Sequence, residues 1–355
     1  RITSECYYPN TASRILDEKG IIHNILNNYS RISYNFGPTL LSWLEEHNPD
    51  TYNGILEADR VSAELFGGHG SAVAQVYNHI IMPLANRRDK ETQVIWGIRD
   101  FEYRFNRKPV GMWLAETAVD MESLRIMANH GIKYTILAPW QLGKYRRIED
   151  GHWVAERDPN VYNRPYRVDL GEGQSITAFV YNGDIAQAVA FNNLLSSGQL
   201  FAEKLLEGFT DSNEPQLVHI ATDGESYGHH HRHGDMALAY CLDHIERGEK
   251  AKLTNYGQYL ELFPPQYEAE IVDNTSWSCI HGIGRWSDDC GCHTGENNSW
   301  NQKWRKGLRE SLNWLRDEII LIYEEHGRSL LKNPWNARNA YICLLYTSPS
   351  PRDHG

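Results

Sequence analysis

The sequence predicts an α/β fold in which parallel strands form a sheet or barrel and a helical region follows them. Through the first two thirds of the chain, short apolar runs of strand length alternate with segments of helical periodicity, which is typical of parallel strands buried on both faces. After about residue 236 the strand-like runs fade and helical periodicity prevails. We therefore expect a barrel-like domain over residues 1–240 and a helical subdomain over residues 241–341.

Four apolar runs have the length and composition of buried strands. They are residues 111–116 (GMWLAE), 134–139 (YTILAP), 175–182 (SITAFVYN) and 217–223 (LVHIATD). The segment between the first two runs places Leu124 and Met127 on one helical face, and Gly131 supplies a C-terminal stop. These residues predict one strand–helix–strand unit.

The other segments are expected to be helices, one loop and a tail. Helical patterns cover residues 39–49, 71–87, 237–248, 255–265 and 300–331, with Pro83 interrupting the second of them. The polar segment 141–173 is expected to be a long loop or a small hairpin over the barrel mouth. Residues 342–355 become rich in Ser and Pro after an apolar start, so we expect a disordered, foreign tail that packs on nothing.

The composition excludes several classes of partner. The chain has 35 basic and 46 acidic residues, a formal charge of −11 and no run of Lys or Arg, so neither nucleic acid nor an anionic membrane is an expected partner. No apolar run approaches the roughly 18 residues that span a membrane, and residues 1–5 do not resemble a secretory leader, so we expect a cytoplasmic location. A neutral substrate suits this charge, and the oligomeric state stays open.

Two carboxylates stand at the ends of strand-like runs. Glu116 closes the first run and Asp223 closes the fourth. In a parallel sheet both lie at the carboxyl edge of the strands, where α/β barrels place catalytic residues, and the nearby Trp113 and Tyr227 supply apolar walls. Two carboxylates between such walls are the groups that cleave a glycosidic bond, one as nucleophile or base and the other as an acid with a raised pKa.

Three segments resemble conserved regions of glycoside hydrolase family 57, a family of α-amylases, glucanotransferases and branching enzymes. The segment GMWLAETAVD resembles the third region, in which a Trp-Leu-Pro-Glu run carries the nucleophile, and Glu116 matches that glutamate. The segment TDGESYGHH resembles the fourth region, and Asp223 matches its general acid/base. The segment YNHIIMPL resembles the second region, and His79 matches its substrate-facing histidine. The three segments occur in the order that the family has.

The resemblance implies an incomplete (β/α)7-type barrel and a retaining mechanism on an α-glucan, with no cofactor and no metal at the site. Glu116 is then the nucleophile and Asp223 the general acid/base, and an oligo- or polysaccharide is the expected partner. The residues expected to bind this substrate are His79, Trp113, Glu225, Tyr227 and His229. Hydrolysis and glucan transfer share the first chemical step, and the sequence does not decide between them.

The sequence departs from the family pattern in three places. The first region, a His-rich segment followed by Gln-Pro on the first barrel strand, has no counterpart, so we expect an amino-terminally truncated fragment that lacks this strand. Ala115 stands where proline is usual, and His230 stands where the branching enzymes have tryptophan, so no single activity follows. The helical carboxy-terminal region resembles that of bacterial members with an extra region after the barrel.

Other interpretations of the site residues stay open. Glu225 suits the start of a helix, and His79 and Trp113 both suit a core. A non-catalytic glycan-binding relative would keep the barrel without turnover. The histidines over residues 229–233 favour a metal-dependent polysaccharide deacetylase-like hydrolase instead, but adjacent side chains on an extended loop point apart and cannot all bind one ion.

A second group of potential metal ligands lies in the segment SWSCIHGIGRWSDDCGCHTG. Its members are Cys279, His281, Cys290, Cys292 and His293. The spacing differs from the usual Cys-x-x-Cys, and a one-residue gap brings neighbouring thiols together poorly, so we expect a Gly-rich loop with reduced thiols and no tightly bound metal. Trp277 in the same segment suits either a sugar-binding platform or the core.

Overall fold

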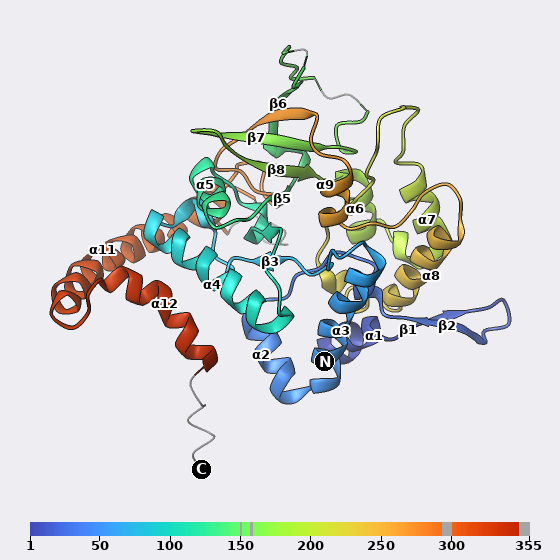
Figure 1. The fold of residues 1–355 in the computed structure, drawn as a ribbon, viewed down its shortest axis with the longest axis horizontal. Helices are drawn as coiled ribbons and strands as arrows, with labels where there is room; N and C mark the ends of the chain where they lie inside the picture. The colour runs from blue at the N-terminus through green and yellow to red at the C-terminus, as the bar shows by residue number, and fades with distance from the viewer. Residues whose placement is uncertain (150, 157–158, 293–299, 348–355) are drawn as a thin grey trace.

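The structure, a computed structural model, describes residues 1–149, 151–156, 159–292 and 300–347 (Figure 1). Its α-helices are α1 (Tyr8–Thr11), α2 (Pro38–His47), α3 (Pro49–Leu65), α4 (Arg87–Phe105), α5 (Met121–Asn129), α6 (Gly183–Phe191), α7 (Gly198–Leu206), α8 (Gly234–Arg247), α9 (Tyr256–Leu262), α10 (Gly284–Ser287), α11 (Trp304–Leu330) and α12 (Pro334–Thr347). Its strands are β1 (Ser13–Leu16), β2 (Ile22–Leu26), β3 (Ala74–Gln75), β4 (Met112–Trp113), β5 (Tyr134–Leu137), β6 (Leu142–Arg147), β7 (Pro165–Gly171), β8 (Gln174–Val180) and β9 (Tyr267–Ile271). The expected mixed α/β fold with helices at the carboxyl end is confirmed.

Parallel neighbours follow one another in the order of the chain. Tyr34 bridges Ala72, β3 pairs with β4, a bridge at Gly111 joins β4 to β5, and β5 pairs with β8, all in parallel. The backbone N–H of Asn182, just after β8, then donates to the carbonyl oxygen of His219 at 2.9 Å. Because these segments run in one direction, their carboxyl ends meet at the same edge.

Three of the four expected strands are confirmed as β4, β5 and β8, and the helix between the first two is α5. The expected strand over residues 217–223 is irregular in the structure. The backbone hydrogen bond from Asn182 joins this segment to β8, but a strand needs a ladder of such bonds, and the segment lines a cavity on its other side. The expected helix over 71–87 is also wrong. It contains β3, paired with β4, and a turn of 3-10 helix at Met82–Leu84.

The expected loop over residues 141–173 contains β6 and β7. The larger sheet has the order β5-β8-β7-β9-β6, in which β7 is antiparallel to β8 and β6 is antiparallel to β9. The charged residues conceal the strand pattern because they pair across strands. Arg167 and Arg146 both bind the carboxylate of Glu268 in β9, and their hydrogen bonds hold the pKa of Glu268 below its usual value.

Helix α4 packs directly on β3. A Cβ atom at Gly97 would lie 2.0 Å from the carbonyl oxygen of Gln75, so this close approach requires glycine. Val76, Met112 and Leu114 are fully buried in the same core. The packing of α4 therefore fixes the position of β3, which ends at Gln75, and of its partner β4.

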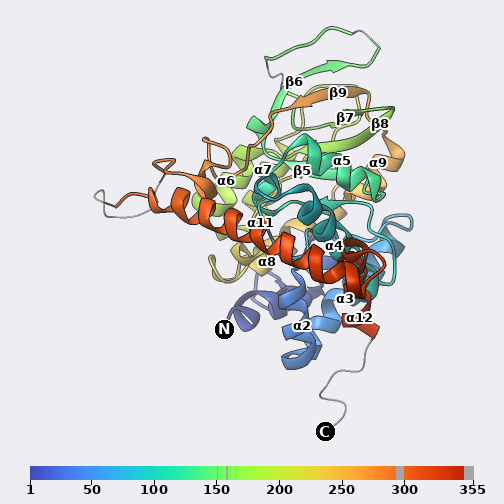
Figure 2. The same ribbon diagram turned by 90° about the vertical axis from the view of Figure 1, so that its left-hand side faces the viewer.

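The helical region begins later than the boundary expected after residue 240. That residue lies inside α8, and β9 pairs within the larger sheet, so the chain belongs with the sheet at least as far as residue 271. The helices α11 and α12 follow, and Figures 1 and 2 place both beside α4. Among the described helices, none is both long and apolar enough to cross a bilayer.

The expectation that the chain packs on nothing from residue 342 onward is wrong for residues 342–347. Ile342 is fully buried, and Tyr346 stacks on Tyr103 of α4 with 4.4 Å between ring centroids. The apolar start of the supposed tail continues α12 and packs against α4 because it presents these two side chains to that helix. Residues 348–355, which include the Ser/Pro-rich stretch, lie outside the described residues.

Candidate active site

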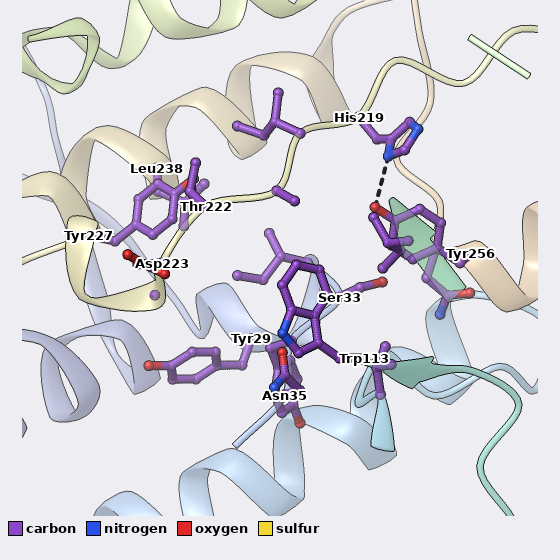
Figure 3. A pocket seen from close by; sticks show the side chains of 18 of the residues that line it. Tyr29, Ser33, Asn35, Trp113, His219, Thr222, Asp223, Tyr227, Leu238 and Tyr256 are labelled. Atoms are coloured by element: carbon purple, nitrogen blue, oxygen red, sulfur yellow. Dashed lines mark hydrogen bonds between the residues drawn. The ribbon is translucent and has the colours of Figure 1, made fainter. Parts of the chain in front are cut away.

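A cavity of about 680 Å³ opens at the carboxyl ends of the parallel strands (Figure 3). Six of the seven predicted site residues line it: His79, Trp113, Glu116, Asp223, Glu225 and Tyr227. They come from the segment after β3, from the end of β4 and the turn that follows it, and from the irregular segment before α8. The parallel arrangement brings together side chains that are far apart in the sequence.

Glu116 stands in a 3-10 turn (Ala115–Thr117) directly after β4. Its backbone has φ 57° and ψ 20°, in the left-handed region that non-glycine residues rarely adopt, and Thr117 follows at φ 50°. The indole N–H of Trp277 donates to Glu116 Oε2 at 2.9 Å, and the backbone N–H of Trp277 donates to the Glu116 carbonyl at 2.9 Å. These two hydrogen bonds hold both the strained backbone and the carboxylate in place.

Aromatic rings form one wall beside Glu116. Trp277 meets Trp113 edge to face with 5.2 Å between ring centroids, and Tyr181 lies edge to face at 6.3 Å on Trp277. Trp277 also lines the cavity, so it contributes to the wall and to the hold on Glu116. Sequence reasoning left its place open between core and sugar platform, because nothing in the pattern links it to a carboxylate that precedes it by 161 positions.

Asp223 begins the short turn Gly224–Ser226 on the opposite side of the cavity from Trp113 (Figure 3). The cavity leaves its side chain accessible, but the surrounding protein atoms displace much of its water, and this desolvation raises its pKa above the usual value. The carboxylates of Glu225 and Glu116 raise it further, while His230 and His79 oppose them. A carboxyl group in such surroundings suits a general acid.

Glu225 is bound by the amino-terminal part of the chain. The hydroxyl of Tyr7 donates a short hydrogen bond to its carboxylate, and both residues line the cavity. Burial, together with this carboxylate, raises the pKa of Tyr7 well above its usual value, so Tyr7 stays a hydrogen-bond donor. Tyr7 carries no motif, and sequence reasoning did not find it.

The remaining predicted residues divide between the cavity and its surroundings. Burial raises the pKa of Tyr227 to about 12, and its hydroxyl accepts a hydrogen bond from Thr222 at 3.0 Å. His79 is exposed at the cavity with a left-handed backbone, at φ 53°. His229 is not among the lining residues, because its Nδ1 turns to Glu5 Oε2 at 2.5 Å.

Two further polar pairs line the cavity and were missed. Asn35 donates to the side-chain oxygen of Gln75 at 2.7 Å, and His219 Nδ1 lies 2.9 Å from the hydroxyl of Tyr256 (Figure 3). Burial lowers the pKa of His219 to about 3, so its imidazole is neutral. Each pair joins segments far apart in the chain, and no spacing in the sequence indicates them.

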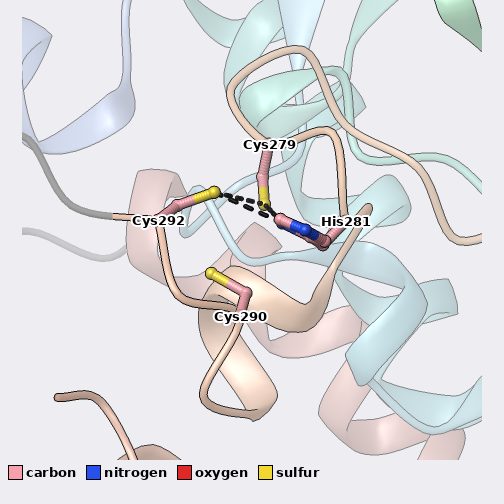
Figure 4. A group of neighbouring side chains, drawn as sticks. All are labelled: Cys279, His281, Cys290 and Cys292. Carbon is pink, nitrogen blue, oxygen red and sulfur yellow. Dashed lines mark hydrogen bonds between the residues drawn. The ribbon is translucent and has the colours of Figure 1, made fainter.

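The sequence-based expectation for the cysteine segment is wrong in its geometry. Cys279, His281, Cys290 and Cys292 converge, with one ligand atom from each lying within 4.8 Å of the others (Figure 4). We call these four residues the thiol–imidazole group. His293, also considered a ligand from the sequence, lies outside the described residues.

Residues 39–272 match the family model described as glycosyl hydrolase family 57, which covers more than half of the chain. The chain belongs to glycoside hydrolase family 57. Residues 300–353 match a second model, described as a domain of unknown function. This match includes α11 and α12, so it covers most of the stretch expected from the sequence to be foreign.

Curated relatives in the family are larger than this chain. It is 22% identical over 244 residues to a 4-alpha-glucanotransferase of Thermococcus litoralis, a match that covers 66% of this chain and 33% of that protein. It is 22% identical over 201 residues to alpha-amylase 1 of Dictyoglomus thermophilum, covering 56% of this chain and 26% of that one. The chain therefore spans about a third or less of the length of these relatives.

Solved structures share the fold at low identity. An exo-type maltose-forming amylase from a Pyrococcus species superposes with a TM-score of 0.71 at 15% identity, covering 92% of this chain and 58% of that chain. The 4-alpha-glucanotransferase of Thermococcus litoralis superposes with a TM-score of 0.59 at 19% identity, covering 93% of this chain and 44% of that chain. The family-57 chain thus has the predicted (β/α)7-type barrel architecture with a helical region after it.

Proposed function

We propose that this family-57 chain carries the catalytic site of a retaining glycosidase or glucan transferase that acts on α-glucans. Glu116 is the nucleophile and Asp223 the general acid/base. The observation that carries the proposal is the pair of unlike carboxyl environments in one cavity: Trp277 hydrogen-bonds Glu116, while desolvation and neighbouring carboxylates favour the protonated form of Asp223. Two acids whose environments differ in this way divide the roles of nucleophile and proton donor.

The first step forms a glycosyl-enzyme. A carboxylate oxygen of Glu116 attacks the anomeric carbon, the bond from that carbon to the glycosidic oxygen breaks, and the proton of Asp223 passes to the leaving oxygen. In the second step Asp223, now ionised, takes a proton from water or from a sugar hydroxyl as that oxygen attacks the anomeric carbon. The ester bond to Glu116 breaks, and both carboxyl groups return to their starting states.

The cavity wall supports a saccharide as the substrate. Trp113 and Trp277 offer apolar ring faces and edges to a sugar ring, while Asn35 and Gln75 offer amide groups to its hydroxyls. Relatives named as amylases and a glucanotransferase support an α-glucan as the substrate class. A cytoplasmic location completes the proposal, and fractionation of cells that express the protein tests it.

The decisive experiment combines product analysis with trapping of the intermediate. The chain is incubated with maltooligosaccharides, amylose and glycogen, and the products are separated by size while NMR follows the first anomer released. We expect products of α configuration, and a fluorinated glycosyl fluoride should label the peptide that contains Glu116. In Glu116→Gln both turnover and labelling should fall by about 10⁴-fold or more, whereas glucan binding persists. Products of inverted configuration, or a label on another peptide, would overturn the proposal.

Two alternatives make different predictions. A metal-dependent deacetylase-like hydrolase needs an Asp and two His converging on one ion. Within the described part of the chain, the thiol–imidazole group is the set of side chains close enough to share an ion, and none of its residues lines the cavity. A non-catalytic glycan-binding protein would bind maltooligosaccharide equally well before and after Glu116→Gln, with no product from either.

A further inference from the structure

The thiol–imidazole group lies on the loop between β9 and α11, outside the cavity (Figure 4). Cys279 Sγ is 3.8 Å from Cys292 Sγ and 3.8 Å from His281 Nδ1, and Cys292 Sγ is 3.3 Å from His281 Nδ1. Cys290 completes the group, with all four ligand atoms within 4.8 Å of one another. Three sulfur atoms and one ring nitrogen therefore surround one small volume.

The three separations among Cys279, His281 and Cys292 are close to those of a tetrahedral zinc site. Zinc binds thiolate sulfur at about 2.3 Å and imidazole nitrogen at about 2.0–2.1 Å, so the edges of an ideal tetrahedron are about 3.8 Å between two sulfurs and about 3.6 Å between sulfur and nitrogen. The sulfur–sulfur distance of 3.8 Å and the sulfur–nitrogen distances of 3.8 and 3.3 Å agree with both edges.

We propose that Cys279, His281, Cys290 and Cys292 bind one structural zinc ion. Three thiolates and an imidazole form a soft ligand set that favours zinc over calcium or magnesium. Four protein ligands fill a tetrahedron and leave no position for substrate or water, so the ion stabilises the loop and takes no part in chemistry.

Two glycines in left-handed conformation shape the loop around the ligands, one of them inside a one-residue gap. Gly291, between two of the cysteines, has φ 75°, and Gly282, directly after His281, has φ 68°. A Cβ atom at Gly282 would lie 2.2 Å from the carbonyl oxygen of Asn274, so this turn requires glycine. In an extended chain, two positions with one residue between them share a face but stand about 6.6 Å apart. The left-handed turns bend the loop, and the four ligand atoms lie within 4.8 Å of one another.

The rest of the loop is held by ordinary hydrogen bonds. Ser276 Oγ donates to the carbonyl oxygen of Gly282 at 3.0 Å, and the backbone N–H of Gly282 donates to the carbonyl oxygen of Cys279 at 3.0 Å. The side-chain amide of Gln302 donates to the carbonyl oxygen of Cys292. Cys279 is buried, whereas the other ligands are partly or well exposed. The backbone is thus arranged around the group, and an ion can enter from the exposed side.

The test measures metal content in the whole chain. Protein produced in zinc-supplemented medium is dialysed and analysed for zinc and iron; we expect about one zinc ion per chain. The paired variant Cys290→Ser with Cys292→Ser should lose it, while the control Cys343→Ser, which changes an exposed cysteine of α12, should keep it. Exchange with Co²⁺ should give the visible bands of tetrahedral thiolate-bound cobalt in the wild type and in the control.

A second pair of variants keeps the test valid if the serine variant fails to fold. His281→Cys preserves four zinc ligands and should retain the ion, whereas His281→Ala removes an exposed side chain and should weaken zinc binding by at least tenfold. The assignment would be overturned by wild-type protein that binds neither zinc nor cobalt, by zinc that persists in the paired cysteine variant, or by a disulfide between Cys279 and Cys292 in protein purified under mildly reducing conditions.

Discussion

The helices α4 and α11 differ in what they bury, although both are long and both follow a helical apolar pattern. In α4, with 19 residues, the buried residues are Lys90, Thr92, Gln93, Val94, Gly97, Asp100, Phe101 and Arg104. In α11, with 27 residues, only Gly327 is buried within the described structure. The apolar side chains that α11 leaves exposed include Trp304, Leu308, Leu312, Trp314, Leu315, Ile319 and Ile322.

The apolar pattern that predicts α11 does not indicate what covers this helix, and α4 was not among the predicted helices. The charged residues of α4 are buried because each has a partner: Lys90 binds Asp120 at 2.5 Å, and Arg104 binds Asp100 at 3.0 Å. The apolar face of α11 stays exposed because little of the described chain packs against it. Changes near β3, β4 and α4 should therefore alter catalysis or folding, and changes on the face of α11 should alter neither.

The largest expected effect is on catalysis, at the cavity that Asp223 and Glu116 both line. Asp223→Asn removes the proposed proton donor, so kcat/KM on glucans with poor leaving groups should fall by about 10²–10⁴-fold, with a smaller loss on activated aryl glycosides. Added azide should restore part of the turnover of activated substrates because it replaces the deprotonated base of the second step. Equal small losses on both substrate types would contradict the role of Asp223.

The same variant should change the pH dependence of stability. The folded state raises the pKa of Asp223 above its unfolded value, so between the two values the folded chain holds more protons, and wild-type stability falls as pH rises through this window. Asp223→Asn removes that loss, so its Tm should exceed that of the wild type above the window and match it more closely below. A Tm difference that is independent of pH would contradict the direction of the shift.

The next largest effect is on stability, and it should differ between a glycine of α4 and a glycine of α11. Gly97→Ala in α4 places a methyl group 2.0 Å from the carbonyl oxygen of Gln75 and should lower the free energy of unfolding by about 3 kcal/mol or more. Gly307→Ala in α11 meets nothing within 4 Å and should raise it by about 0.5–1 kcal/mol through helix propensity. Urea denaturation measures both changes, and equal values would refute the comparison.

A smaller effect is expected from Trp277→Phe. The ring stays, but Glu116 loses its hydrogen bond from the indole N–H, and a hydrogen bond to a charged group is worth about 1.5–3 kcal/mol. We expect kcat to fall about tenfold with KM nearly unchanged. The matched control is Trp286→Phe, in the same loop but outside the cavity lining, which should leave both constants as they are. An equal loss in the two variants would indicate a general weakening of the loop.

The smallest effect is expected on the exposed face of α11. Leu312→Gln and Leu315→Gln together should change the free energy of unfolding by no more than about 0.5 kcal/mol and leave kcat/KM unaltered, because both side chains are about half exposed. The same urea titration and glucan assay give the answer. A loss of stability above about 1 kcal/mol would show that this face is covered.

The sequence predicts the α/β class and the two carboxylates of the cavity because local signals there agree with the three-dimensional arrangement. Glu116 and Asp223 each end an apolar run, and parallel segments carry both to one edge. Longer-range contacts were not predictable in this way. The strand β6 was hidden because its Arg146 pairs with Glu268 of β9. The end of α12, from residue 342, was taken for a tail because the partner of Tyr346 lies on α4.

The ligand group was missed for a different physical reason. In an extended backbone, ligands with one residue between them stand about 6.6 Å apart, whereas the loop with left-handed turns at Gly282 and Gly291 brings all four ligand atoms within 4.8 Å of one another. His229 was assigned to the cavity because it belongs to the matching motif, but its ring nitrogen contacts the carboxylate of Glu5, which lies 224 positions earlier in the chain.

The short distance along the chain between Trp277 and Cys279 affects how inhibition is interpreted. Trp277 holds Glu116 by two hydrogen bonds, and Cys279 belongs to the proposed zinc site two residues further on. If the proposed ion is present, a chelator that removes it would loosen this loop and lower activity, although the proposed mechanism uses no metal in bond cleavage. Sensitivity to EDTA would then accompany glycosidase chemistry, and only the released product, a shortened or rearranged glucan as opposed to acetate, identifies the reaction.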